Sequence, residues 1–340
     1  KYRALTQATF IELYKKGLVY EDVRINNWDP KLRTTIADSE IEYEDISSNF
    51  NDIKWKIKET GEEIVIGTTR PELICTCGMV IFNPEDKRYK HLEGKTAISP
   101  LFEKEIPVKS HPLAQIDKGT GIVMMCSAGD LSDIQFFREQ KLTPVIAINK
   151  EGRMNEYSGF LKGLKVREAR EKIIEKLKEK KLLVKQEKIN HRTPISERSG
   201  AEIEFIEMPE YYLKQLKFKK EIKKVSKKIN FFPKESEKIL DDWLELISID
   251  WPISRRRFYA TEIPLWYSEK NGEKLIALPK QGNYYKPWKE FVPSDAEVFK
   301  YGKKVGNVKD KKFKSLDWKG EERVFDTWMD SSISELFILK

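Results

Sequence analysis

The fold class is decided by the stretch IKWKIKETGEEIVIGTTRPE, residues 53–72. Residues 53–57 alternate apolar and polar side chains, 59–62 have the composition of a hairpin turn, and 63–66 form the return strand. Two threonines, an arginine, a proline and a glutamate follow directly at 68–72. The stretch therefore predicts an antiparallel β-hairpin that ends in a polar loop.

Similar short strands surround this hairpin. The alternation and the turn residues predict further strands at 18–20, 23–25, 79–82, 96–98, 106–108, 121–125 and 145–148. Helical periodicity predicts helices at 5–19, 166–181, 209–228 and 234–247, the second with Val166, Ala169, Ile173 and Leu177 on its apolar face. These changes of pattern predict a strand-rich unit at 40–188, inserted between two pieces, 1–39 and 189–340, of another fold.

The composition limits the class of protein. The chain has 340 residues with a formal net charge of +8, and no apolar run reaches the roughly 20 residues that cross a bilayer. A polyanionic partner and a lysine-rich soluble surface both explain the charge. Three cysteines and no signal peptide indicate a reduced, cytoplasmic protein without membrane attachment. Because residue 1 is lysine, we expect a fragment of a longer protein.

The polar loop at 68–72 has two interpretations. Thr69 as N-cap, Pro71 in the first turn and Glu72 three residues after Thr69 would form a capping box. That box leaves Thr68 and Arg70 unexplained. Hydroxyls, a guanidinium and backbone N–H groups at a helix start can also bind a phosphate or a sugar.

A second candidate site follows the strand at 121–125. Gly119-Thr120-Gly121 precedes that strand, and Ser127-Ala128-Gly129-Asp130-Leu131-Ser132-Asp133 follows it. Asp130 and Asp133 are three residues apart at a predicted helix start, so both carboxylates can face one side. They either cap the helix and complement its dipole or bind a substrate ammonium.

Metal ligation is not expected. The three histidines, His91, His111 and His191, have no ligand spacing, and Cys75 and Cys77 lack two further ligands. Buried small side chains are the better interpretation of the cysteines.

Two aromatic-rich stretches lie nearer the C-terminus, at 250–259 and 325–332. The first holds Trp251, Ser254 and the consecutive arginines 255–257, and the second holds Asp326 and Trp328. Each stretch alone is explained by a hydrophobic core. Arginines in a row, however, require partners or exposure.

Taken in order, these motifs resemble the class I aminoacyl-tRNA synthetases for branched aliphatic amino acids, and among them the valyl-tRNA synthetases of archaeal type. The matching segments are 27–38, 68–72, 119–121, 129–133, 149–154, 164–171, 251–255 and 326–328. The resemblance implies an α/β fold: part of a class I Rossmann-type catalytic core, interrupted by a β-rich, β-barrel-like editing insertion at 40–188. The piece 1–39 would lead into the insertion, and 189–340 would return to the core with a helical connective segment.

The resemblance also implies a function and its residues. The whole enzyme would charge tRNA(Val) with valine, using ATP and Mg²⁺, and would hydrolyse Thr-tRNA(Val) formed in error; we expect a monomer. In the editing site, Thr68, Thr69, Arg70 and Glu72 would lie on the side of the 3′-terminal adenosine and the ester. Asp133 would bind the aminoacyl ammonium, and Asp130 would orient water or the substrate hydroxyl. Asp133, Asp130 and Thr69 are thus the expected catalytic residues, and Trp251, Ser254, Arg255, Asp326 and Trp328 belong to the synthetic core.

Some family features are absent from the sequence. It contains no H-x-G-H and no K-M-S-K-S motif, which fits a fragment that retains editing without activation. Ser196, Ser199, Ser268 and Asn271 stand where the family often has zinc-binding cysteines, so no zinc is expected. Met124 stands where some bacterial relatives carry a lysine. An isoleucyl enzyme that edits Val-tRNA(Ile), a free-standing deacylase and a non-catalytic tRNA-binding module remain the alternatives.

The first prediction concerns amino-acid activation. Without the two missing motifs, nothing stabilises the developing charge on the triphosphate of ATP. Valine-dependent ATP–pyrophosphate exchange by this chain should stay at background, and clear exchange would contradict the expectation of a fragment.

Overall fold

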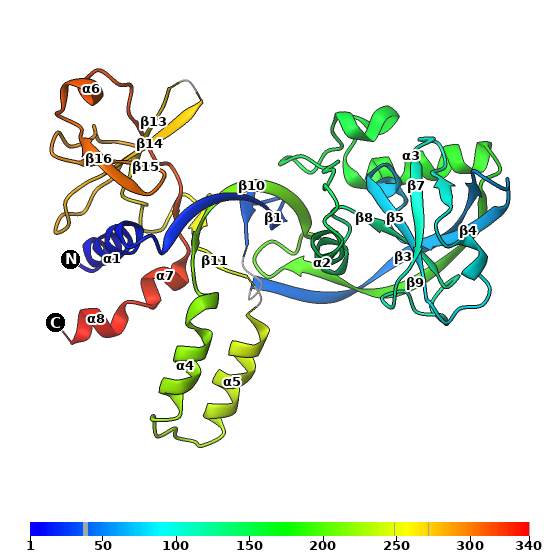
Figure 1. The fold of residues 1–340 in the computed structure, drawn as a ribbon, viewed down its shortest axis with the longest axis horizontal. Coiled ribbons are helices and arrows are strands. Elements are labelled where there is room, and N and C mark those ends of the chain that lie inside the picture. The colour runs from blue at the N-terminus through cyan, green and yellow to red at the C-terminus, as the bar shows by residue number, and fades with distance from the viewer. Residues whose placement is uncertain (37–39, 248, 271, 340) are drawn as a thin grey trace. The chain divides into compact units, whose positions relative to one another are not determined.

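The computed structural model describes residues 1–36, 40–247, 249–270 and 272–339. Its contacts divide the chain into two compact units, one of residues 25–208 and one of 1–24 together with 209–340 (Figure 1). The middle unit extends beyond the predicted 40–188 on both sides, partly because Trp28, Ile206 and Met208 form one buried cluster. The predicted boundary at 39 lies outside the described residues. The three-part division itself remains a prediction.

A mixed β-sheet forms the centre of the 25–208 unit. Its strands are β3 (Ile41–Ile57), β4 (Glu63–Thr68), β5 (Cys77–Phe82), β6 (Thr96–Ile98), β7 (Glu105–Ser110), β8 (Ile122–Cys126) and β9 (Leu183–Ser196). They follow the order β4-β3-β6-β7-β5-β8, and β9 pairs with β3. β5 and β7 run parallel, whereas the neighbouring pairs are antiparallel. The end strands β4 and β8 contact each other, so the sheet curls.

The hairpin that predicts this sheet is confirmed, with β3 and β4 paired from Asn51–Thr68 to Lys56–Glu63. Alternate residues point inward, as a pleated strand requires. The buried set on these two strands comprises Ile53, Trp55, Ile57, Ile64 and Ile66.

Helices and short 3₁₀ turns cover the sheet. They are η2 (Pro71–Thr76), η3 (Lys90–Leu92), α2 (Leu131–Glu139), η4 (Glu156–Leu161) and α3 (Val166–Glu179). Ala169, Ile173 and Leu177 of α3 are completely buried in the main core, which confirms most of the predicted apolar face. α2 places Phe137 against Gly78 of β5, where an added Cβ would lie 2.6 Å from the ring.

Strands β1 (Val19–Asp29) and β10 (Glu204–Leu213) carry the chain through the boundary of the two units. The short β2 (Thr34–Thr35) pairs with β1 in the middle unit, and β11 (Trp251–Pro252) pairs with β10 in the other. The part of β10 before Pro209 belongs to the middle unit, so Glu204 lies in that unit.

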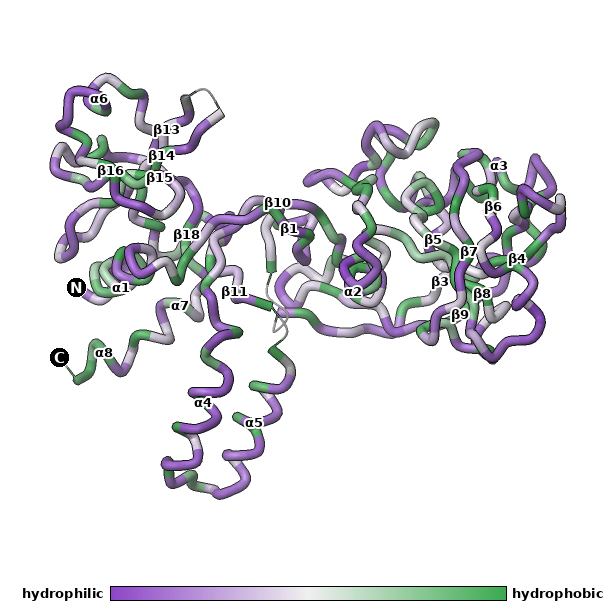
Figure 2. The backbone as a smooth tube through the Cα atoms, viewed as in Figure 1, coloured by the Kyte–Doolittle hydropathy of each residue, from purple (hydrophilic) through white to green (hydrophobic). Residues whose placement is uncertain are grey.

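The unit of residues 1–24 and 209–340 contains several helices. These are α1 (Tyr2–Lys15), η5 (Leu216–Phe218), α4 (Lys219–Ser226), α5 (Ser236–Leu246), α6 (Lys311–Lys314), α7 (Thr327–Ser331) and α8 (Ser334–Ile338). Phe10 and Ile11 of α1 are buried in its core beside Tyr211 and Phe325. α4 is lysine-rich and mostly hydrophilic in Figure 2, with Ile222 and Val225 on its apolar side.

Short antiparallel pairs complete this unit. β12 (Ser254–Arg255) pairs with β18 (Val324–Phe325). A separate sheet has the order β16-β15-β14-β13-β17, formed by β13 (Trp266–Lys270), β14 (Glu273–Leu278), β15 (Glu297–Lys300), β16 (Lys303–Asn307) and β17 (Lys319–Gly320). These pairings are antiparallel.

Three secondary-structure predictions were wrong. Residues 209–213 belong to β10 rather than to a helix from 209 to 228, because the backbone at Tyr212 and Leu213 pairs with β11 and the Tyr211 side chain is buried in the core. Residues 145–148 form no strand and make only one isolated bridge, between Ile148 and Met154. The strands predicted at 18–20 and 23–25 are one continuous strand, β1. Within the described ranges, no helix combines the length and the apolar character that a membrane crossing needs.

The curled sheet depends on its buried tryptophan. Trp55 is 2% exposed, and Trp55→Ala should lower the free energy of unfolding of the 25–208 unit by about 3–5 kcal/mol, because it leaves a large cavity. Urea denaturation measures the loss. Lys56→Ala, the exposed neighbour on β3, is the control, and an equal loss in both variants would contradict this assignment of the core.

Candidate active site

The curled sheet brings the two polar motifs of the middle unit together. β4 ends at Thr68 and β8 ends at Cys126, and these two strands are in contact. The loop after β4 contains Thr69 and Arg70, and the loop after β8 contains Gly129. The Arg70 Nη1 donates a hydrogen bond to the Gly129 carbonyl oxygen at 3.3 Å. Residues more than 50 positions apart in the sequence therefore form one candidate site.

The loop after β4 does not form the predicted capping box. Helix η2 begins at Pro71, and its N-cap residue is Arg70 rather than Thr69. The Thr68 hydroxyl accepts the Arg70 N–H at 3.0 Å, and the Thr68 carbonyl accepts a hydrogen bond from Asn51 at 3.1 Å. These contacts fix the loop on β3 and β4, with Thr69 partly exposed.

Glu72 is buried instead of capping a helix. Its carboxylate is 0% exposed and accepts hydrogen bonds from Arg170 on α3 at 3.0 and 3.1 Å. It also accepts one from Arg70 at 3.0 Å. A buried carboxylate needs such compensation, and two guanidinium groups supply more of it than a backbone N–H would.

Arg70 has a second carboxylate partner, Glu204 on β10, at 2.8 Å. Burial raises the pKa of Glu72, but the charges of Arg170 and Arg70 outweigh it, and the net pKa is lowered. For Glu204, burial dominates and raises the pKa, and Arg70 only partly opposes this. The network thus joins the loop after β4 with η2, α3 and β10 through two buried carboxylates and two partly exposed guanidinium groups.

Sequence reasoning missed Arg170 and Glu204. Glu204 stands within the apolar run Ile203-Glu204-Phe205-Ile206, and a charge in such a run signals a buried partner. The local pattern gives no such signal for Arg170, because it lies in a helix rich in lysine and glutamate; only its place in the family-like segment 164–171 points to it.

The two aspartates have different environments. Asp130 is exposed and is the N-cap of α2, since its Oδ1 accepts the Asp133 N–H at 2.8 Å and the Ser132 hydroxyl at 2.6 Å. The capping interpretation is therefore confirmed for Asp130. Asp133 is partly buried against Gly129, where an added Cβ would lie 2.1 Å from the Asp133 Oδ2.

The pKa of Asp133 is raised well above its usual value. Burial is the main cause, and the charge of Asp130 adds to it. Hydrogen bonding with the Cys126 backbone and the charge of Arg70 lower the pKa in part. A carboxyl shielded in this way keeps its proton to higher pH than an exposed one, and a carboxyl with a perturbed pKa is typical of functional sites.

The cysteines beside the site are buried side chains. Cys77 and Cys126 are opposite each other on β5 and β8, and Cys75, Cys77 and Cys126 form no disulfide. Burial raises the pKa of Cys75 to about 12, so its thiolate is not available at neutral pH. Among the described residues, no cluster of histidine, cysteine, aspartate and glutamate could hold a metal ion.

The two aromatic-rich stretches also meet, in the other unit. Arg255 is 0% exposed, and its Nη2 donates to the Asp326 Oδ2 at 2.7 Å. The Trp251 indole N–H donates to the same oxygen at 3.2 Å. The Ser254 hydroxyl donates to the buried carboxylate of Glu210. Trp328 is 59% exposed and contributes its backbone N–H to the Asp326 Oδ1.

The family model of tRNA synthetases class I (I, L, M and V) matches residues 1–340. The chain belongs to this family. Its resemblance to valine–tRNA ligases is confirmed, because it is 44% identical over 340 residues to that of Aeropyrum pernix, covering 100% of the chain and 40% of the relative. It is 46% identical to that of Nanoarchaeum equitans, covering 100% of the chain and 42% of the relative.

This class I synthetase chain thus spans about 40% of the length of the curated relatives it matches. Among solved structures, the chain is similar to one in a ternary complex of LeuRS, tRNA and LeuAMS from Agrobacterium radiobacter K84. The match covers 98% of this chain and 43% of the chain in that complex. The identity is 14% and the TM-score 0.35.

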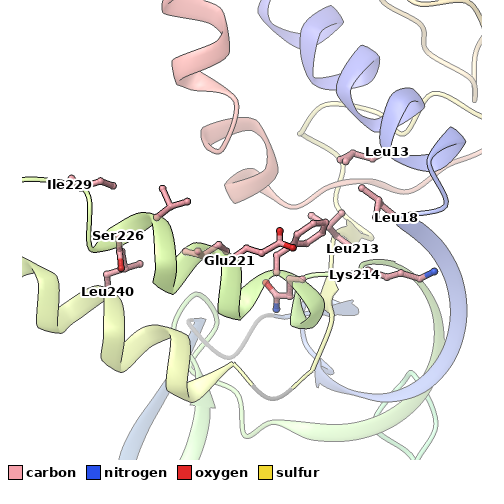
Figure 3. Close-up of a pocket in the computed structure, with 12 residues that line it drawn as sticks. Leu13, Leu18, Leu213, Lys214, Glu221, Ser226, Ile229 and Leu240 are labelled. Carbon is pink, nitrogen blue, oxygen red and sulfur yellow. The ribbon is translucent and has the colours of Figure 1, made fainter.

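The synthetase chain also has an apolar groove of about 560 Å³ in the unit of residues 1–24 and 209–340. Figure 3 shows Leu13 and Leu18 near Leu213, with Leu240 and Ile229 farther along the helices. Apart from Lys214 and Glu221, the residues that line the groove carry no charge. The groove is therefore a poor candidate for a catalytic site.

The environment of Asp133 predicts how stability depends on pH. The folded chain keeps the Asp133 proton at pH values where the unfolded chain, with a pKa of about 3.9, has lost it. Stability therefore falls as pH rises from about 4 towards the raised folded pKa. Asp133→Asn removes this loss and should raise the melting temperature more at about pH 8 than at about pH 4.

Asp130→Ala is the matched comparison. It removes the N-cap of α2 and should lower stability by about 1 kcal/mol. If Asp133→Asn gave the same change in melting temperature at both pH values, the shielded environment assigned to Asp133 would be wrong.

Proposed function

We propose that this chain is part of a valyl-tRNA synthetase and contains its editing site. The whole enzyme would charge tRNA(Val) with valine at the expense of ATP and would hydrolyse Thr-tRNA(Val). The chain alone would retain hydrolysis but not activation. The observation that supports this most is the hydrogen bond from Arg70 to the Gly129 carbonyl, beside Asp133. The chain that contains it is 44% identical to a valine–tRNA ligase.

The need for editing follows from the size of the amino acids. A pocket that fits valine rejects threonine by only about a hundredfold, because the two differ by a methyl and a hydroxyl; this enzyme and pair are a standard example of the limit. A second site must recognise the threonine hydroxyl and hydrolyse the ester. The curled sheet of residues 41–196 is the proposed location.

The proposed roles of the residues are those that the resemblance to the synthetases implies, and the exposure of the residues is compatible with them. Asp133, beside Gly129, would bind the aminoacyl ammonium. The positive charge of that ammonium would favour the ionised form of the Asp133 carboxyl. Thr68 and the partly exposed Thr69 would face the 3′-terminal adenosine and the ester. Arg70, whose side chain is 21% exposed, would add its charge there, while the fully buried Glu72 acts through Arg70.

Hydrolysis requires a positioned water molecule. Its oxygen would attack the ester carbonyl carbon, and the bond to the ribose oxygen would break, with that oxygen receiving a proton. The exposed Asp130 would orient the water or the threonine hydroxyl. A neighbouring tRNA ribose hydroxyl would assist, since the site offers no evident strong base.

The other unit would belong to the synthetic core of the Rossmann type. Trp251, Arg255 and Asp326 are joined there by hydrogen bonds, and Ser254 lies beside them. ATP and Mg²⁺ would be needed by the whole enzyme, and no zinc is proposed. The proposed partners are tRNA(Val), valine and threonine, for a cytoplasmic monomer that is not attached to a membrane.

Deacylation of charged tRNA tests the function. The chain should hydrolyse Thr-tRNA(Val) faster than Val-tRNA(Val) and Val-tRNA(Ile). Asp133→Ala should slow single-turnover hydrolysis about ten- to hundredfold, because it removes a charge-assisted contact of about 1.5–3 kcal/mol.

Glu139→Ala, at the exposed end of the same helix, is the control and should keep the rate of the unchanged chain. Preferential hydrolysis of Val-tRNA(Ile) would favour an isoleucyl enzyme. Salt-sensitive binding of tRNA without any hydrolysis would favour a tRNA-binding module and exclude the proposed editing activity.

A further inference from the structure

Two charged residues to which the sequence assigned no role contact the candidate site from elements that follow it in the sequence. Arg170 lies on α3 and Glu204 on β10. Their side chains are 26% and 6% exposed; Arg170 binds Glu72 of η2, and Glu204 binds Arg70 of the loop after β4. Neither belongs to the set expected to touch substrate.

The contacts form a continuous chain of hydrogen bonds. Arg170 donates two to Glu72, at 3.0 and 3.1 Å, and Glu72 accepts a third from Arg70. Arg70 in turn binds Glu204 at 2.8 Å and the Gly129 carbonyl at 3.3 Å. Gly129 is the residue against which the Asp133 carboxylate is placed.

The number of donors explains why two residues besides Arg70 and Glu72 are needed. The two oxygens of Glu72 are shared between two guanidinium groups, so Arg70 donates to Glu72 only through its Nε. Its two terminal nitrogens are then available for Glu204 and for Gly129. Without Arg170, the fully buried Glu72 would have only Arg70 to compensate its charge.

We propose that Arg170 and Glu204 are positioning residues of the deacylation site, which hold Arg70 against the Gly129 carbonyl and so keep the Asp133 carboxylate in its working position. The inference rests on the proposed function. In this proposal both residues act through Arg70.

A displaced Arg70 has a measurable effect on Asp133. The groups that face Asp133 are Asp130 at the start of its own helix, Arg70 from the loop after β4, and Cys126 at the end of β8. Arg70 is the cation among them and favours the ionised carboxylate. If Arg70 moves towards Glu72, the Asp133 carboxyl should titrate at higher pH.

The test compares Arg170→Gln, Arg170→Lys and Glu204→Gln in the 340-residue chain. Arg167→Gln is the matched control, because Arg167 lies on the same helix with a side chain 91% exposed. The Asp133 carboxyl is followed by ¹³C NMR in aspartate-labelled protein, assigned with Asp133→Asn. The kcat/KM for hydrolysis of Thr-tRNA(Val) is measured over the same pH range, together with the melting temperature.

Arg170→Gln and Glu204→Gln should move the Asp133 titration to higher pH and lower kcat/KM about tenfold or more, the effect of one lost charge-assisted contact. The pH profile of kcat/KM should shift in the same direction. Arg170→Lys should have a smaller effect, because lysine keeps the charge without the paired donors. Arg167→Gln should match the unchanged chain.

An Asp133 titration that stays in place in the folded variants overturns the proposal, even if melting is lowered. If Arg170→Gln does not fold, Arg170→Lys and Glu204→Gln decide by the same criterion. The NMR readout needs no tRNA, so a chain that hydrolyses nothing but shows the shifts would refute the proposed function and leave the positioning of Asp133 intact.

Discussion

The candidate site depends on the compensation of one fully buried negative charge. Glu72 has no exposed surface and is held between the guanidinium groups of Arg70 and Arg170. Breaking a buried pair by removing one partner is far more costly than the pair's net contribution to stability. The arrangement therefore acts less as a source of stability than as a constraint on geometry. It determines which way Arg70 points, and Arg70 connects the two loops.

The same principle recurs in the other unit with different residues. Arg255 is completely buried and binds Asp326, which also caps α7 and accepts the indole N–H of Trp251. One carboxylate thus joins two segments that are more than 70 residues apart. In both units, a buried carboxylate bound by arginine holds together motifs that resemblance to the synthetases singled out separately.

Sequence patterns were informative where a local rule applies. The alternation at 53–57 and 63–66 predicted the β3–β4 hairpin, and the apolar face of α3 was predicted from Ala169, Ile173 and Leu177. Asp130 as a helix cap also follows from a local rule. No local rule predicts that Arg170 is a partner of Glu72, because Arg170 lies 98 residues away and its helix is rich in charged residues. Residues 209–213 were misassigned for a related reason: their strand conformation comes from pairing with β11, a tertiary effect that outweighs the local pattern.

The glycine at position 129 makes the site sensitive to change at a residue without a side chain. Even the single methyl group of alanine would lie 2.1 Å from the Asp133 Oδ2, so one of the two must move. Such a variant would keep every hydroxyl, guanidinium and carboxylate of the site. Its defect would look chemical in an assay of turnover, yet its origin would be steric.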